Sequence, residues 1–94
     1  MKVRFSPEFL HKLKASDVRL RDQFKRRIIL FCRRPNELIL RNHALKKDWG
    51  GYRSINITGD IRAIYTEKMD GRSKIAYFVA VGTHRELYSQ NMDE

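Results

Sequence analysis

Cysteine, proline and long apolar runs are scarce in this chain of 94 residues. Cys32 is the only cysteine, so no internal disulfide can form, and a reducing cytoplasm suits the chain. No stretch approaches the roughly 18 consecutive apolar residues of a transmembrane helix, and Lys2 and Arg4 are not followed by the apolar run of a secretory signal. We therefore expect a cytoplasmic protein that is neither exported nor embedded in a membrane.

The usual metal and nucleotide motifs are also missing. The chain has no glycine-rich phosphate loop, no helical pair of zinc-binding histidines and no zinc-ribbon spacing. We therefore expect neither a metal nor a cofactor. Cys32 falls on an apolar helical stripe, which favours a packing role over nucleophilic catalysis.

Acidic residues are few in the N-terminal half. Residues 1–47 contain 14 Lys and Arg against 4 Asp and Glu, whereas residues 48–94 contain 6 against 7. The net charge of +9 favours a polyanion such as nucleic acid, an anionic membrane surface or an acidic protein as partner. Hydrophobic residues make up 41% of the chain, which is enough for one globular domain over residues 1–94.

The first third of the chain is expected to form a strand and a helical hairpin. Alternation over residues 2–5 predicts an edge strand, and Ser6 followed by proline is a typical helix start. A second helix should begin after Ser16 or Asp17 and end before Pro35. The side chains expected to face the core are Val3, Phe5, Phe9, Leu10, Leu13, Leu20, Phe24, Ile28, Phe31 and Cys32.

The rest of the chain is expected to form a three-stranded antiparallel meander. Residues 36–49 show no period, so we expect a largely extended connection there. The expected strands are 52–57, 61–67 and 74–81, with turns at 58–60 and 69–72, Gly82 as the end of the last strand, a helical turn at 85–88 and a frayed tail at 89–94. The sequence thus predicts an α+β fold in which one sheet carries the two-helix hairpin on one face.

The second helix is unusually basic on its outer face. Arg19, Arg26 and Arg33 fall seven residues apart, and Lys25, Arg27 and Arg34 lie beside them. A solvated charged face and a phosphate-binding face are equally good interpretations of this pattern.

Four ionisable residues at strand ends and loops are candidates for chemistry: His43, Asp60, Arg62 and His84. His84 follows directly on an apolar strand, where a side chain can be rigidly held and still exposed. This position favours a functional role. His11, on the polar side of the first helix, is more typical of a structural residue.

Four short segments together resemble the RelE/ParE superfamily of bacterial toxins, most of all the YafQ type. They are Leu40–Leu45, Trp49–Arg53, Asp60–Tyr65 and Gly82–Tyr88, and the similarity spans nearly the whole chain. The resemblance implies a RelE-like fold and the toxin of a type II toxin–antitoxin system. It further implies a ribosome-dependent endoribonuclease that cleaves messenger RNA, inhibits translation and is neutralised by a cognate antitoxin, with no membrane partner.

The resemblance also implies roles for single residues. His43, Asp60 and His84 match catalytic positions of YafQ-type toxins, and Arg62 matches the arginine that holds the scissile phosphate in RelE and YoeB. Asn56 stands where the family has a further histidine, and an amide cannot transfer a proton near neutral pH. The residues expected to contact RNA or the ribosome are Arg26, Arg33, Lys46, Lys47, Arg53, Asn56 and Tyr88, of which Tyr88 matches a C-terminal aromatic that could stack on a base.

RNA cleavage without a metal asks for these residue types on chemical grounds. A base must remove the proton of the 2′-hydroxyl, an acid must protonate the leaving 5′-oxygen, and a cation must offset the charge on the phosphorus. Histidine, with an unperturbed pKa of about 6.5, suits the proton transfers, and the planar guanidinium of arginine suits the phosphate. We assign His84 as acid, Asp60 or His43 as base and Arg62 as phosphate clamp.

The sequence also allows two other functions. A ParE-like inhibitor of DNA gyrase would share the fold but lack the catalytic histidines. A non-catalytic basic module would bind nucleic acid through the arginine-rich helix alone. The combined presence of His43, Asp60 and His84 argues for the nuclease.

Overall fold

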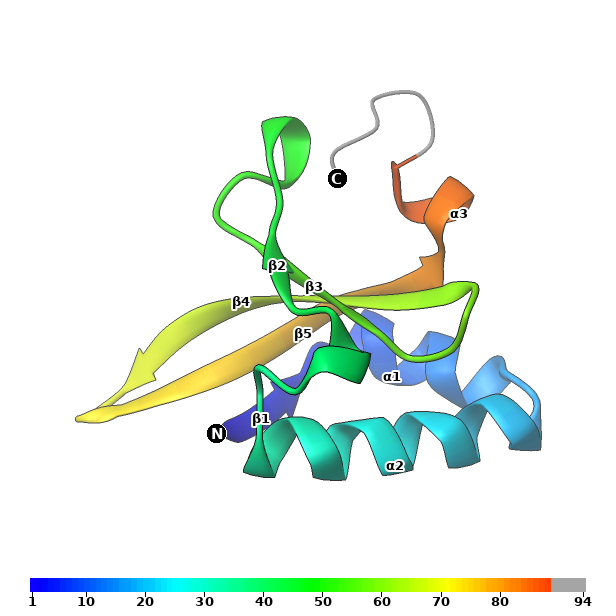
Figure 1. The fold of residues 1–94 in the computed structure, drawn as a ribbon, viewed down its shortest axis with the longest axis horizontal. Coiled ribbons are helices and arrows are strands. Elements are labelled where there is room, and N and C mark those ends of the chain that lie inside the picture. The colour runs from blue at the N-terminus through cyan, green and yellow to red at the C-terminus, as the bar shows by residue number, and fades with distance from the viewer. Residues whose placement is uncertain (89–94) are drawn as a thin grey trace.

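The computed structural model describes residues 1–88, which form one mixed sheet with two helices on one face and a short helix on the other (Figure 1). In chain order the elements are β1 (Lys2–Phe5), α1 (Pro7–Ala15), α2 (Val18–Arg33), the 3-10 turn η1 (Leu38–Leu40), β2 (His43–Ala44), the 3-10 turn η2 (Lys47–Trp49), β3 (Arg53–Asn56), β4 (Ile61–Asp70), β5 (Ser73–Thr83) and α3 (His84–Tyr88). The tail expected at residues 89–94 lies outside the described residues.

Both helices of the hairpin begin at side-chain caps. The Ser6 hydroxyl oxygen accepts the Phe9 N–H at 3.1 Å, and Pro7 is the first residue of α1. Of the two candidates for the second cap, Asp17 is used, because its carboxylate accepts the Leu20 N–H at 2.8 Å. The expected helical hairpin is therefore confirmed, including the end of α2 before Pro35.

The strands follow the order β1-β5-β4-β3-β2. β1 is an edge strand, as expected, and pairs in parallel with β5, while the other neighbours are antiparallel. Residues 36–49 were expected to form a largely extended connection, but the structure contains two 3-10 turns there, and His43–Ala44 between them pairs with β3 as a fifth strand of the sheet. A strand of two residues contains no alternation for the sequence to reveal.

β4 and β5 are longer than their apolar patterns. They run to Asp70 and from Ser73, so the turn shrinks to Gly71 and its neighbour, and Gly71 adopts a positive φ of 63°. β5 also continues past Gly82, which was expected to end it. Pairing between β4 and β5 extends both strands beyond their buried parts.

The main core lies between the sheet and the helices α1 and α2. Phe9, Phe31, Tyr65 and Phe78 are each at most 1% exposed, and the ring centroids of Phe78 and Tyr65 are 5.1 Å apart. Leu10, expected in this core, is 44% exposed and lines a surface pocket instead. Its position on α1 lies too far around the helix from Phe9 to reach the sheet.

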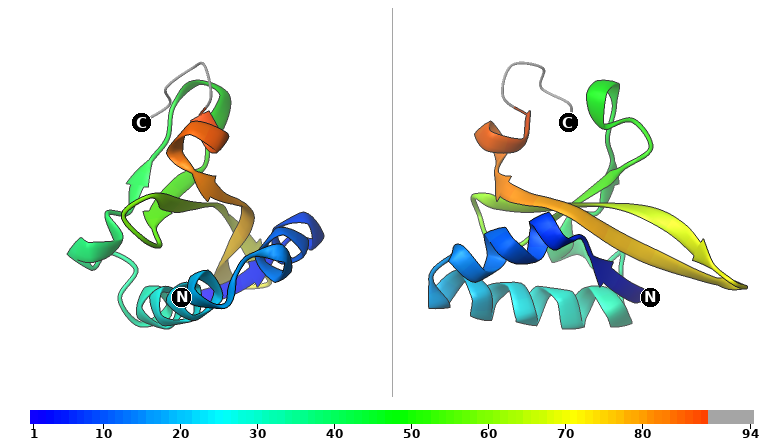
Figure 2. Two further views of the ribbon diagram at one scale, coloured as in Figure 1. Left: turned by 90° about the vertical axis from the view of Figure 1, so that its right-hand side faces the viewer. Right: turned by 180° about the vertical axis from the view of Figure 1, so that it is seen from behind.

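A second, smaller cluster covers the opposite face of the sheet. Leu45, Ile64 and Tyr88 are buried there, with Trp49 and Leu87 packed against them. The Trp49 indole donates a hydrogen bond to the carbonyl of Leu87 at 3.0 Å. These contacts attach α3 to the sheet beside the loop that holds η2 (Figure 2). Within residues 1–88, every helix is too short or too polar to cross a membrane.

Candidate active site

A surface pocket of about 400 Å³ lies where the β3–β4 turn meets the end of β5. It is lined by Gly59, Asp60, Arg62, Thr83, His84 and Arg85. Arg62 is in register with Gly82, and this pairing brings the start of β4 to the end of β5. Three of the residues predicted to be catalytic, Asp60, Arg62 and His84, therefore meet in one place.

Asp60 projects from a turn that the preceding threonine braces. The Thr58 hydroxyl oxygen accepts the N–H of Asp60 at 3.2 Å and that of Ile61 at 3.0 Å. Asp60 itself is exposed. A carboxylate is thus held at the rim of the pocket by a local backbone motif.

Arg62 is half-buried and turned back over the same turn. Its Nη1 donates to the carbonyls of Gly59 at 3.0 Å and Thr58 at 3.2 Å. Asn56 lies directly opposite it on β3, on the same face of the sheet. Within residues 1–88, Asn56 Oδ1 and Arg62 Nε are buried and make no hydrogen bond. The guanidinium is therefore fixed by turn carbonyls through one of its nitrogens.

His84 is the first residue of α3 and is half-buried. Its ring packs on Tyr88, with centroids 4.6 Å apart and planes at 60°. Tyr88 is in turn 2% exposed and packed with Leu45 and Ile64. One side of the imidazole is thus supported by a ring that the second cluster holds in place.

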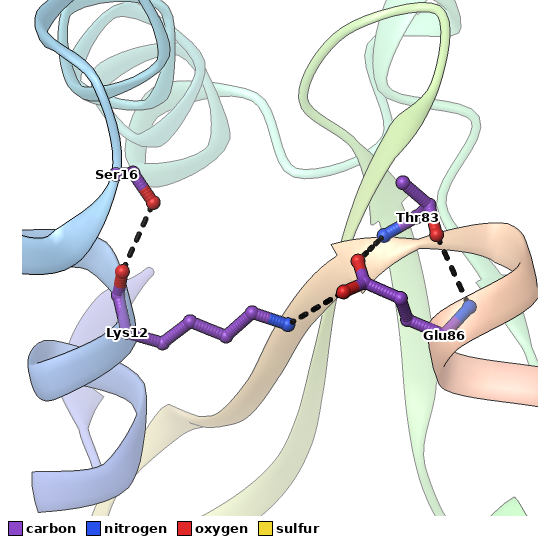
Figure 3. Close-up of polar contacts among 4 residues, drawn as sticks. All are labelled: Lys12, Ser16, Thr83 and Glu86. Carbon is purple, nitrogen blue, oxygen red and sulfur yellow. Dashed lines mark hydrogen bonds and ion pairs between the residues drawn. The ribbon is translucent and has the colours of Figure 1, made fainter.

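The backbone around His84 is fixed by a capping box (Figure 3). Thr83 donates its N–H to Glu86 Oε1 at 2.8 Å, and Glu86 donates its N–H to Thr83 Oγ1 at 3.1 Å. Lys12 of α1 approaches the other oxygen of Glu86 to 3.7 Å. The hydrogen bond from the Thr83 backbone, and then the positive charge of Lys12, lower the pKa of Glu86 below its ordinary value.

His43 shares this face of the sheet but does not line the pocket. It pairs with Ser54 of β3, which pairs with the buried Ile64 of β4. Because β3 separates β2 from β4, His43 lies roughly 10 Å across the sheet from the strand that carries Arg62. A His43 ring nitrogen lies 2.7 Å from the carbonyl oxygen of Arg41.

Arg53 lies on the other face and does not join the site. It is in register with Tyr65 of the main core, and its Nε donates to Asn42 Oδ1 at 2.8 Å. Asn42 Nδ2 also donates to the Tyr65 hydroxyl at 2.8 Å. Burial raises the pKa of Tyr65, although Asn42 and Arg53 partly oppose the shift. Arg53 was expected to contact RNA, and that contact stays a prediction; in the fold its Nε belongs to this hydrogen-bond network on the face opposite the pocket.

The remaining residues expected to bind RNA are divided between the two faces. Arg26 and Arg33 are exposed on α2, beneath the sheet, whereas Lys46 and Lys47 are exposed at η2 on the side of α3 (Figure 1). The expectation that Tyr88 offers its ring to a base is contradicted by its burial, because apolar neighbours already cover it.

Arg85, Thr83, Glu86 and Lys12 were missed as parts of the site. Threonine followed three residues later by glutamate at positions 83–86 is a capping-box signature and could have revealed the first turn of α3. Nothing in the sequence indicates that Lys12 reaches Glu86, because the contact depends on how α1 lies beside β5. Within residues 1–88, no three His, Cys, Asp or Glu side chains are grouped so that they could hold a metal ion.

Comparison with known proteins finds similarity in structure only. No family model matches the chain, and no curated protein is similar to it in sequence. YafQ from E. coli strain BL21(DE3) superposes with a TM-score of 0.73 at 23% identity, covering 94% of this chain and 98% of YafQ.

Two further structures give similar agreement. A YoeB/ParE toxin from Agrobacterium tumefaciens has a TM-score of 0.70 at 22% identity and covers 89% of this chain and 99% of its own. A chain of the E. coli DinJ–YafQ complex has a TM-score of 0.70 at 24% identity and covers 94% and 98%. The RelE-like α+β fold predicted from the sequence is thus confirmed, and the chain has the fold of the YafQ and YoeB/ParE toxins.

Proposed function

We propose that this chain is the toxin of a toxin–antitoxin pair and that it cleaves messenger RNA on the ribosome. The observation that carries the proposal is the pocket in which Asp60, Arg62 and His84 meet. A carboxylate, a guanidinium and an imidazole are the groups that acid–base cleavage of RNA requires. The shared fold with YafQ and YoeB/ParE toxins supports the toxin assignment.

The reaction begins at the 2′-hydroxyl of the RNA. Asp60 accepts its proton while the 2′-oxygen attacks the adjacent phosphorus. The bond from phosphorus to the 5′-oxygen breaks, and His84, in its protonated form, delivers a proton to that leaving oxygen. The products are a 2′,3′-cyclic phosphate and a 5′-hydroxyl end, and no outside reactant is consumed. Arg62 neutralises the charge that builds on the phosphoryl oxygens.

The geometry favours Asp60 over His43 as the base. Asp60 lines the pocket with His84, whereas His43 lies on β2, two strands away from β4. His43 would then contact the RNA on the same face of the sheet, at the edge strand β2. Arg62 must leave the carbonyls of Thr58 and Gly59 to hold a phosphate, and a bound phosphate offers stronger, charge-assisted hydrogen bonds in exchange.

Two basic surfaces support binding to ribosomal RNA. Arg26 and Arg33 belong to the exposed face of α2, and Lys46 and Lys47 lie beside η2. Because these surfaces lie on different sides of the sheet, the protein can contact RNA around the pocket and also behind it. The DinJ–YafQ complex supports a cognate antitoxin as a further partner. A function on the ribosome also implies a cytoplasmic location.

The test is single-turnover cleavage of messenger RNA on programmed ribosomes, with cut sites read by primer extension. We expect cleavage by the wild type and a loss of about 10²- to 10⁴-fold in His84→Ala and Asp60→Ala. His43→Ala should lose less, and His11→Ala, on the exposed side of α1, is the matched control with unchanged rate.

Three results would overturn parts of this proposal. Absence of cleavage at every codon removes the nuclease. Intact transcripts together with failing DNA supercoiling in cells would move the assignment to gyrase inhibition. A folded His84→Ala protein with the wild-type rate removes His84 as the acid.

A further inference from the structure

The ion pair between Lys12 and Glu86 joins parts of the molecule that lie on different faces of the sheet (Figure 3). Lys12 belongs to α1, which packs with the main core, and Glu86 belongs to α3, above the pocket. β1 pairs with β5 only as far as Phe78, so the next part of β5 has an open edge, and α1 runs beside it. Lys12 reaches around this edge to the face that carries the pocket.

Gly82 makes room for the contact. A Cβ atom at residue 82 would lie 2.9 Å from Glu86 Oε1 and 2.9 Å from Lys12 Nζ. Both distances are shorter than real Cβ contacts, so a larger residue at position 82 would displace the flexible ends of these two side chains. Gly82 also pairs with Arg62 across the sheet. The absence of a side chain at this position therefore allows the ion pair to form directly beside the residues of the pocket.

The capping box encloses the pocket residues of α3. His84 and Arg85 are the two residues between Thr83 and Glu86, so the reciprocal hydrogen bonds close a loop around them. A helix of five residues is too short to be stable through its own hydrogen bonds. Its first turn, and hence the direction of the His84 side chain, depends on contacts such as this box.

Exposure argues that these contacts orient the helix more than they stabilise the fold. The side chains of Lys12 and Glu86 are 49% and 55% exposed. Solvent-exposed ion pairs add little to folding stability. Glu86 nevertheless makes a hydrogen bond and an ion pair through its two oxygens, and this fixes its carboxylate relative to both α1 and the end of β5.

We propose that Glu86 and Lys12 are positioning residues, which hold the first turn of α3 so that His84 points into the pocket beside Arg62. The inference rests on the proposed nuclease function for its effect on rate. Neither residue is expected to touch the RNA. Glu86 acts through the backbone of Thr83, and Lys12 acts through Glu86.

The test compares variants that remove the contacts separately. Glu86→Gln keeps a residue that can complete the capping box but removes the charge, Glu86→Ala removes both contacts, and Lys12→Met removes the ion pair alone. Gly82→Ala leaves Lys12, Thr83 and Glu86 unchanged and adds one methyl group beside the Lys12–Glu86 contact. Glu8→Gln, an exposed change on α1 with no described role in the pocket, is the control.

Two readouts are measured on each folded variant. The first is the nuclear Overhauser effect between the rings of His84 and Tyr88, which reports the orientation of His84 without any activity. The second is single-turnover cleavage at saturating ribosome concentration, together with the Kd for the ribosome. We expect Glu86→Ala to lose the ring contact and up to about 100-fold in rate, because a shift of about 1 Å has this effect, with Kd unchanged. Gly82→Ala should have a smaller effect, because the flexible ends of Glu86 and Lys12 can move away from the added methyl group. Lys12→Met and Glu86→Gln should lose less than about 10-fold, since the capping box survives.

The outcomes separate this inference from the proposed function. If the wild type does not cleave RNA, the nuclease proposal fails, and loss of the ring contact in Glu86→Ala still supports the structural half of the inference. If Glu86→Ala keeps the ring contact, or loses it and cleaves at the wild-type rate, the positioning role is refuted. A change in Kd alone also refutes it, because it assigns the residues to binding.

Discussion

Removing the side chain of Asn42 should destabilise the protein without touching the pocket. Asn42 accepts a hydrogen bond from Arg53 Nε at 2.8 Å and donates to the Tyr65 hydroxyl at 2.8 Å and the Pro35 carbonyl at 2.9 Å. Asn42→Ala removes all three. At about 1 kcal/mol of net stability for each hydrogen bond, the expected loss is about 3 kcal/mol. Since small domains are stable by about 5–15 kcal/mol, the variant should still fold.

Urea unfolding followed by circular dichroism measures this loss. With a slope of about 1.5 kcal/mol per molar urea, the midpoint should fall by about 2 M. The double variant Asn42→Ala/Tyr65→Phe tests the reasoning further, because removing the Tyr65 hydroxyl removes a group that the first change leaves without its partner. The losses of stability in the single variants Asn42→Ala and Tyr65→Phe should therefore sum to more than the loss in the double variant, with a coupling free energy of about 1 kcal/mol.

Urea unfolding and ribosome binding of the variant Arg53→Ala test the role of Arg53. Its structural role predicts that Arg53→Ala destabilises the fold by about 1 kcal/mol and leaves the salt dependence of ribosome binding unchanged. A loss below about 1 kcal/mol in Asn42→Ala, or strict additivity with Tyr65→Phe, would refute the network as a source of stability.

Three further predictions concern charge, pH and the pocket. Charge reversal at Arg26 and Arg33 should weaken ribosome binding and flatten its dependence on salt, measured by filter binding from low to high salt; an unchanged slope would assign α2 a merely solvated face. Because the pKa of Tyr65 is raised from 10.0, the folded state keeps its proton longer than the unfolded state, so stability should fall as pH rises above about 10. In Tyr65→Phe that decline should be shallower, and identical slopes would contradict the shift. Asn56→His should increase the single-turnover rate, because it places a titrating group opposite Arg62, and a slower variant would show that the amide itself is needed.

The regular parts of the fold were predictable because periodicity reveals them. The caps Ser6 and Asp17, the stripe of α2, the alternation in β3 and the apolar run of β5 all rest on local rules that the tertiary structure preserves. β2 was not predictable, since two residues carry no period and their pairing depends on the partner strand. The position of α1 beside the open edge of β5 also depends on tertiary packing, which explains why the Lys12–Glu86 contact was missed.

The site was partly predictable for a related reason. Asp60, Arg62 and His84 could be found because they lie at strand ends, and the register of β4 with β5 brings such ends together. The position of Arg53 on the face opposite the pocket was also predictable, because the alternation that places Ile55 and Ile57 inward places Arg53 on the same face. The burial of Tyr88 was not predictable, because a single helical turn has no second position from which to infer its buried side.

The parallel pairing of β1 with β5 has a consequence for how the protein is made. The first strand waits for a partner about 70 residues further along the chain, and at about 5–20 residues per second this delay lasts about 4–14 s. Phe5 and Phe9 have no Phe78 to pack against until then. The last residues of the pocket, His84 and Arg85, follow β5 in the chain. A nascent copy therefore cannot assemble the pocket until β5 and the first turn of α3 have been synthesised, although the strand, the two helices and the turn that support the pocket come earlier in the chain.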